Sequence, residues 1–280
     1  MLVLPPYQYC YSRREFKTDS RRDASRCGFV DSLCQYSCDR KSEGESRSMS
    51  GLEASRQFWD EKARENPYWY VSSAGPYDGR NLEEFWASGP KIWNDLKSAS
   101  GYQPAPSDTV VEIGCGVGRL TRAIAPEVGK VFAFDLSAEM LAIARNSVEA
   151  SNASFNRAET PALAEIADSS VDAFVAYCVF QHLPDLDVLH GYLKTAARVL
   201  KPGGRLIFTM TPRTWRDSIA FALRMRRWLV ERRSSDGPRG LYRNEWYGIR
   251  PTVQEIESLS PIKTKNLLLH GDKLLFFGAR

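Results

Sequence analysis

Apolar and polar residues change their spacing repeatedly along the central part of the chain. Segments near 118–126, 138–150 and 186–200 repeat apolar residues at the spacing of an amphipathic helix. Strands that alternate with such helices predict a parallel sheet covered on both faces, which is a doubly wound α/β fold. The apolar runs that predict those strands lie at 109–113, 131–134, 153–157, 172–178 and 205–210.

A glycine-rich turn follows the first predicted strand. Glu112 and Ile113 lead into Gly114-Cys115-Gly116-Val117-Gly118, after which a helical pattern begins. Glycine lets a ligand approach the backbone closely, but the spacing E-x-G-x-G-x-G differs from the G-x-G-x-x-G of dinucleotide-binding folds. The carboxylate of Glu112 would repel a pyrophosphate and attract an amine. The turn therefore favours an adenosyl amino acid over a nucleotide.

The second predicted strand also ends at an acidic residue. In Lys130-Val131-Phe132-Ala133-Phe134-Asp135, the final carboxylate is placed to accept hydrogen bonds from both hydroxyls of a ribose. Ser137 is a natural N-cap for the helix that follows. An isolated acid at this point is more often an ordinary turn or capping residue. Because Asp135 occurs together with the glycine turn, we predict that it binds a ribose.

These segments resemble those of the class I S-adenosylmethionine-dependent methyltransferases, of the broad small-molecule type. The resemblance covers about residues 108–210 and consists of VVEIGCGVGRLT, FAFDLS, SVDAFVAYCVFQHLPD and RVLKPGGRLIFT, in the family's order. It implies a Rossmann-like, seven-stranded, mostly parallel sheet with helices on both faces. The runs Ile262–Leu269 and Lys273–Gly278 would supply its terminal antiparallel pairing. It also implies S-adenosylmethionine as cofactor and says little about the methyl acceptor.

The resemblance assigns roles around the methionine and ribose portions of the cofactor. Glu112 would reach the methionine amino group, Asp135 would bind the ribose, and the backbone carbonyl of Cys178 would meet the methionine ammonium. Leu136 and Met140 would flank the adenine. The turn that would pass under the methionine and ribose consists of Gly114, Cys115, Gly116 and Gly118.

The adenine side departs from the family pattern. Related sequences usually carry an acid followed by Ala after the third strand, whereas this chain has Arg157-Ala158-Glu159. An arginine cannot accept a hydrogen bond from the adenine amino group. Two alternatives stay open: either Glu159 substitutes for the acid, or packing and the Ala158 backbone hold the adenine.

His182 follows the fourth strand and is the candidate catalytic base. Methyl transfer to a hydroxyl or ammonium requires loss of a proton, and an imidazole can accept it. A histidine in an -HLP- turn also commonly does no more than hold the loop, so both interpretations stay open.

The pattern predicts three parts in the chain. Residues 1–48 show no helical or strand period and are expected to be a disordered leader, with Met49 as an alternative start of translation. Residues 49–104 are expected to form a helical extension that caps the acceptor side, and residues 105–280 the S-adenosylmethionine-binding methyltransferase domain. The aromatic residues expected to wall the acceptor side, although each could equally be core, are Trp69, Tyr70, Tyr77, Phe85 and Trp86.

The predicted domain contains a helical basic insert at 213–250, with ten arginines against four acidic residues. A solvated basic face is one interpretation. A lid over the acceptor pocket is another, because ligands of open α/β sheets bind at the carboxyl ends of strands and arginines pair with anions. Aromatic residues between the arginines also suit stacked bases, so RNA methylation is an alternative.

Composition adds further expectations. The net charge of +4 over 280 residues is too modest to imply a nucleic-acid partner. No apolar run approaches the roughly 18 residues of a membrane span, and no secretory signal is recognised, so a cytoplasmic protein without a membrane partner is predicted. No metal is predicted, because no paired zinc-binding spacing occurs among Cys10, Cys27, Cys34 and Cys38.

The predicted function is therefore methyl transfer from S-adenosylmethionine to an oxygen or nitrogen of a small molecule, with anionic or aromatic acceptors as the first candidates. Two alternatives are an RNA methyltransferase that uses residues 213–250 and a non-catalytic S-adenosylmethionine-binding protein. A nicotinamide-dependent oxidoreductase would require the G-x-G-x-x-G spacing, which the turn lacks. The sequence does not indicate an oligomeric state.

Overall fold

The computed structural model describes residues 51–73, 77, 81–213, 226, 229, 240–241, 243–270 and 273–280. Contacts divide the chain into Met1–Gly44 and Glu45–Arg280, and all described residues belong to the second unit. The predicted leader 1–48 lies outside the described residues. So does most of the predicted basic insert, since only 213, 226, 229, 240–241 and 243–250 are described within it.

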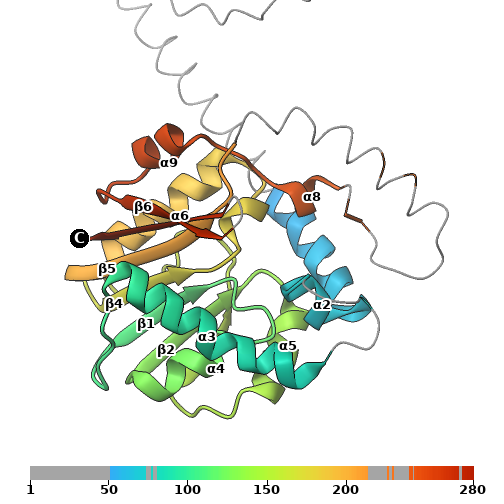
Figure 1. Ribbon diagram of the computed structural model, residues 1–280, viewed down its shortest axis with the longest axis horizontal. Coiled ribbons are helices and arrows are strands. Elements are labelled where there is room, and N and C mark those ends of the chain that lie inside the picture. The colour runs from blue at the N-terminus through green and yellow to red at the C-terminus, as the bar shows by residue number, and fades with distance from the viewer. Residues whose placement is uncertain are drawn as a thin grey trace, which may run out of the picture. The chain divides into compact units, whose positions relative to one another are not determined.

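Within the described residues, seven strands form one sheet in the order β3-β2-β1-β4-β5-β7-β6 (Figure 1). All pairings from β3 to β5 are parallel, and β7 pairs antiparallel with both β5 and β6. The predicted fold class, a mostly parallel seven-stranded sheet with terminal antiparallel pairing, is confirmed. The strands are β1 (Thr109–Ile113), β2 (Lys130–Asp135), β3 (Ala153–Arg157), β4 (Val171–Ala176), β5 (Leu200–Met210), β6 (Lys265–His270) and β7 (Lys273–Ala279).

Helices cover both faces of the sheet, as the strand–helix alternation predicts. On one face lie α3 (Leu82–Ser100), α4 (Thr121–Ile124) and α5 (Ala138–Ser147). On the other face lie α6 (Leu186–Val199) and α9 (Val253–Leu259). Residues 51–65 are also helical, and the short helices are α2 (Pro67–Val71), η1 (Ala125–Glu127), η2 (Phe180–His182) and α8 (Asn244–Tyr247).

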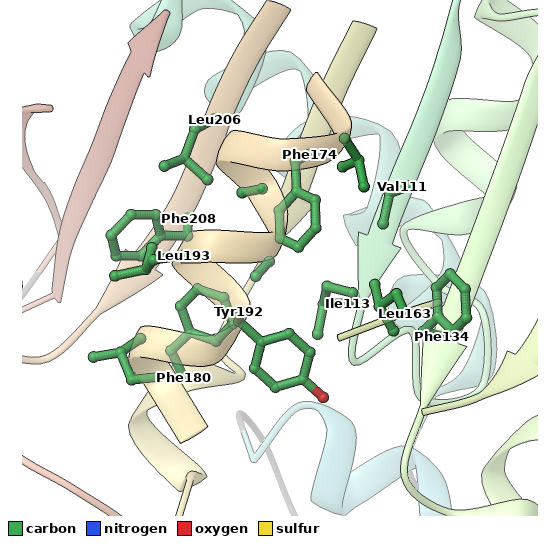
Figure 2. Close-up of a cluster of buried hydrophobic side chains, with 14 of the residues drawn as sticks. Val111, Ile113, Phe134, Leu163, Phe174, Phe180, Tyr192, Leu193, Leu206 and Phe208 are labelled. Carbon is green, nitrogen blue, oxygen red and sulfur yellow. The ribbon is translucent and has the colours of Figure 1, made fainter. Parts of the chain in front are cut away.

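Alternation of side chains along the strands divides the core into two layers. Val111 and Ile113 of β1 pack on the α6 side with Phe174 and Phe208, as Figure 2 shows. Val110 points to the opposite layer, which contains residues of α3, α4 and α5. Successive residues of a strand face opposite sides of the sheet, so β1 is buried on both sides and forms the centre of the fold.

Several element ends differ from the predicted spans: β5 begins at Leu200 where 205 was predicted, and α5 ends at Ser147 where 150 was predicted. Two further differences have local reasons. The predicted helix over 118–126 is shorter, because α4 ends at Ile124 and continues as η1. Pro126 has no backbone N–H for a further α-helical turn. The fourth strand was predicted over 172–178, but β4 ends at Ala176. Tyr177 and Cys178 therefore leave the sheet and enter the loop at its carboxyl edge.

The strand order reverses direction next to β1. The chain runs outward from β1 to β2 and β3, and then returns to place β4 on the other side of β1. In open α/β sheets, ligands bind in the crevice at such a switch point, outside the carboxyl ends of the strands. The topology therefore predicts a ligand site at the loops after β1 and β4.

Among the described residues, no helix is both long and apolar enough to cross a membrane.

Candidate functional site

A cavity of about 1630 Å³ opens at the carboxyl ends of the parallel strands. Most of the residues that the sequence assigns to the cofactor lie in its wall, and His182 lies there too. Gly118 and Glu159 are not among the lining residues. The predicted residues that line the cavity are Glu112, Gly114, Cys115, Gly116, Asp135, Leu136, Met140, Ala158, Cys178 and His182.

The glycine turn is held against the ends of β1 and β2. Gly114 and Cys115 donate backbone hydrogen bonds of 2.7 and 3.0 Å to the Phe134 carbonyl, and the Gly116 amide donates to Asp135 Oδ2 at 2.8 Å. Gly116 has φ of +54°, a left-handed conformation that glycine adopts without steric cost. The turn is therefore preformed, with its backbone exposed to the cavity.

Gly116 and Gly118 serve different purposes within this turn. A Cβ at Gly116 would lie 2.9 Å from Val71 Cγ2 of α2, and both residues line the cavity. A Cβ at Gly118, where φ is +86°, would lie 2.5 Å from Val148 Cγ2 just after α5. Gly118 therefore lets α5 pack closely against the turn. Because Gly118 faces α5, it does not line the cavity.

Glu112 places a buried carboxylate in the cavity wall. It is the fourth residue of β1 and is only 2% exposed. Thr121 Oγ1 donates a 2.6 Å hydrogen bond to its Oε2. Burial raises the pKa of Glu112 to about 7, and the Thr121 hydrogen bond opposes that rise. An ammonium group brought beside Glu112 would favour its ionised form.

Asp135 joins the end of β2 to the glycine turn and to α5. Its Oδ2 accepts from Gly116 and its Oδ1 accepts from the Ser137 amide at 2.9 Å. Burial raises the pKa of Asp135, while these backbone hydrogen bonds lower it. Each carboxylate oxygen can accept more than one hydrogen bond, so both can still bind hydroxyl groups. Ser137 caps α5, as predicted, by accepting from the Met140 amide at 3.1 Å.

The segment predicted to bind adenine is held by an arginine that sequence reasoning missed. Arg56, in the helix at 51–65, donates to the carbonyls of Ala158 and Glu159. The Glu159 carboxylate lies 3.3 Å from Arg56 Nη2 and 3.7 Å from Arg157 Nε, and its side chain is 66% exposed. Glu159 therefore faces these arginines, outside the cavity. The geometry favours the alternative in which packing and the Ala158 backbone hold an adenine.

His182 lies at the other end of the cavity, and both of its ring nitrogens have a hydrogen-bonding neighbour. Its Nδ1 is 2.6 Å from the Trp246 carbonyl, and a carbonyl can only accept, so Nδ1 carries the hydrogen. Its Nε2 lies 3.3 Å from Gln181 Nε2. Burial, together with the charges of Lys273 and Arg250, lowers the pKa of His182 to about 4, although the hydrogen bond to the Trp246 carbonyl opposes the shift. The imidazole is therefore neutral at neutral pH, with Nε2 as its basic atom.

Aromatic residues and cations form the rest of this end. Of the aromatic residues predicted for the acceptor side, Tyr70 lines the cavity, whereas Trp69, Tyr77, Phe85 and Trp86 do not. Trp69 instead stacks on Trp246, with ring centres 6.3 Å apart. The other cavity-lining residues that the sequence did not single out include Trp59, Lys91, Asp95, Arg119 and Lys273.

Lys273 belongs to no sequence motif, but the direction of its strand could have predicted its position at the cavity. An antiparallel strand begins at the edge where its parallel neighbours end, so the first residue of β7 reaches the carboxyl edge. In the part of the chain that the structure describes, no group of three or more His, Cys, Asp or Glu side chains is arranged to hold a metal ion.

Comparison with known proteins gives consistent matches. Residues 111–208 match the Methyltransferase domain family. The chain is 36% identical over 108 residues to phosphoethanolamine N-methyltransferase 2 of Caenorhabditis elegans, covering 38% of this chain and 24% of that protein. It is 33% identical over 116 residues to the ubiquinone biosynthesis O-methyltransferase of Xanthomonas oryzae pv. oryzae, covering 41% and 46%. The matched segment is thus less than half the length of either relative.

Solved structures resemble the whole described fold. The complex of DhpI with SAM and HEP has a TM-score of 0.54 at 19% identity, covering 82% of this chain and 98% of DhpI. The magnesium protoporphyrin IX methyltransferase ChlM from Synechocystis, with bound SAH, has a TM-score of 0.51 at 16% identity, covering 80% and 97%. At such identities the likeness concerns the fold alone.

Proposed function

We propose that the chain is a class I S-adenosylmethionine-dependent methyltransferase that methylates an oxygen or nitrogen of a small molecule, with S-adenosylmethionine as its cofactor. The match of residues 111–208 to the Methyltransferase domain family supports this proposal. The observation that carries the proposal is a pair of carboxylates, the buried Glu112 and the half-buried Asp135, beside a preformed glycine turn in one cavity. Burial raises the pKa of both groups, so a ligand that brings a cation or hydrogen-bond donors to them would stabilise their ionised forms.

The polar and apolar side chains of the cavity wall fit S-adenosylmethionine. Glu112 offers a carboxylate to the methionine amino group, and Asp135 offers two acceptor oxygens to the ribose hydroxyls. Leu136, Met140 and Ala158 give an apolar wall for adenine. When bound, S-adenosylmethionine supplies a methyl group on a positively charged sulfur: the acceptor's lone pair forms the new bond to the methyl carbon, and the electron pair of the broken carbon–sulfur bond stays on sulfur.

His182 is the proton acceptor in this proposal. Its Nδ1 is held by the Trp246 carbonyl at 2.6 Å, which orients the ring and leaves the lone pair on Nε2. Because its pKa is about 4, it stays neutral and passes the proton to water. Loss of activity on acidification through His182 is therefore expected near pH 4, well below the about 6.5 of an ordinary histidine.

The proposal includes the predicted division of the chain. Trp59 from the helix at 51–65, and Tyr70 and Val71 from α2, line the cavity, which supports a capping role for residues 49–104. Arg56 of the same segment contacts the Ala158–Glu159 carbonyls, so the cap also reaches the cofactor side. Residues 105–280 supply the remaining cavity wall.

Methyl transfer is tested with S-adenosylmethionine labelled in its methyl group. The full chain is incubated with pooled small-molecule alcohols, phenols, acids and amines, and in parallel with cellular RNA. Mass spectrometry should find label on oxygen or nitrogen of a small molecule, and none with Gly116→Val. Label on RNA alone would replace the proposal with the RNA alternative. Cofactor binding without transfer to any pool would favour the non-catalytic alternative.

A further inference from the structure

Charged side chains of both signs line the cavity. Glu112 and Asp135 lie at the end formed by β1 and β2, where the cofactor is proposed to bind, and Arg119 acts electrostatically on Glu112. Lys273 and Arg250 line the other end and both act electrostatically on His182. His182 is neutral at neutral pH, so this end presents cationic side chains beside an uncharged imidazole.

Lys273 is the cation whose surroundings are most informative. It is half-buried at the start of β7, and its Nζ lies 2.8 Å from Cys178 Sγ and 5.2 Å from the centre of the Tyr177 ring. Among the described residues, it forms no ion pair with a carboxylate. A thiol is a weak hydrogen-bond acceptor, so neither neighbour compensates the ammonium.

The fold holds this ammonium at the reacting end of the site. Leu274 pairs with Met210 at the end of β5, so Lys273 lies one residue further, level with the loops that follow the parallel strands. Its contact with Cys178 places it beside the end of β4, next to the segment that carries His182. A partly buried cation is costly unless an anion pairs with it. Asp95 also lines the cavity and acts electrostatically on Tyr177, but it forms no ion pair with Lys273.

We propose that the methyl acceptor is an anion, and that its carboxylate or phosphate group pairs with Lys273. This inference rests on the proposed methyltransferase function and specifies its substrate class. Aromatic walls such as Trp59 and Trp246 could also suit an organic cation. The ammonium of Lys273 argues against that alternative, because it would repel a cationic ligand.

The test uses the full chain loaded with S-adenosylhomocysteine, so that it measures binding and does not depend on turnover. Benzoate, phenyl phosphate and the uncharged benzamide are titrated into the loaded protein by calorimetry. The variants are Lys273→Met, which removes the charge, and Lys273→Arg, which keeps it. Lys265→Met is the matched control, because Lys265 is an exposed residue of β6 outside the cavity wall.

At least one anion should bind saturably and about tenfold or more tightly than benzamide, as expected for a charge-assisted hydrogen bond. Lys273→Met should lose that advantage, Lys273→Arg should keep most of it, and Lys265→Met should leave it unchanged. Equal binding of benzamide, no saturable anion binding, or an unaffected Lys273→Met would overturn the inference. Failure of the intact protein to bind S-adenosylhomocysteine at all would instead refute the proposed function.

Discussion

Glu112 should make cofactor binding depend on pH. Its pKa of about 7 reflects burial, and only the ionised form pairs with the ligand's ammonium. We expect the affinity for S-adenosylhomocysteine to fall about tenfold per pH unit below about 7 and to level off above about 8. Calorimetry across this range tests the expectation with Glu112→Gln as control, since the amide should bind weakly at every pH. Equal wild-type affinities at about pH 6 and about pH 8 would contradict it.

The same carboxylate should destabilise the ligand-free fold. Because folding raises the Glu112 pKa from 4.5 to about 7, the folded state binds the proton more tightly, so the free energy of unfolding falls as pH rises between these values. Glu112→Gln keeps an acceptor for Thr121 and removes the charge. We expect this variant to be more stable than the wild type by about 2–3 kcal/mol at about pH 8 and nearly equal at about pH 4. Urea unfolding at both pH values measures the difference; a less stable variant at about pH 8 would refute the interpretation.

Residue roles could be predicted from the sequence where the chemistry is local. Glu112 and Asp135 stand at strand ends beside the glycine turn, and the structure brings both to one cavity. Glu159 could not be judged in this way. Its carboxylate is drawn to Arg56, a partner about a hundred positions away that belongs to no motif.

At the scale of elements, the glycine turn combines ligand approach with helix packing. Gly118→Ala should lower the free energy of unfolding by about 1–3 kcal/mol, because it adds strain at φ of +86° and an overpacked contact with Val148. Its effect on S-adenosylhomocysteine affinity should be small. Gly116→Val should abolish S-adenosylhomocysteine binding, because the added side-chain atoms would occupy cavity space beside Val71 that the ligand needs.

Urea unfolding and calorimetry on the two glycine variants separate these roles. If Gly118→Ala lost ligand affinity while its unfolding was unchanged, Gly118 would be a binding residue, as the sequence predicted, and the packing interpretation would be wrong.

Strands and helices were predictable because each carries its own period. The runs that predicted β1 and β3 match the observed strands, and the Ser137 cap appears where its position before α5 predicts it. The end of α4 at Ile124 shows where such prediction fails. The apolar spacing predicted a helix to residue 126, but the α-helical hydrogen bonds end at Ile124 and a 3-10 turn follows.

At the scale of the whole molecule, the cavity combines segments from distant parts of the chain. Trp59 precedes the sheet in sequence, Trp246 follows β5, and Lys273 begins the last strand, yet all three line the same space as Glu112. The meeting of Glu112 and Asp135 with Lys273 in one cavity arises only from this assembly. A single sequence without long-range contacts indicates the cofactor end through its motifs and leaves the acceptor end undetermined.

The most direct test is calorimetric titration of S-adenosylhomocysteine into the wild-type chain and into Asp135→Ala, with NADH as the control ligand. We predict micromolar binding of S-adenosylhomocysteine, no binding of NADH, and a loss of about 1.5–3 kcal/mol in Asp135→Ala through the removed charge-assisted hydrogen bonds. Asp135→Asn, which keeps one acceptor oxygen, should lose less. Absence of binding to the wild type, or an affinity unchanged in Asp135→Ala, would contradict the assignment of this cavity to S-adenosylmethionine.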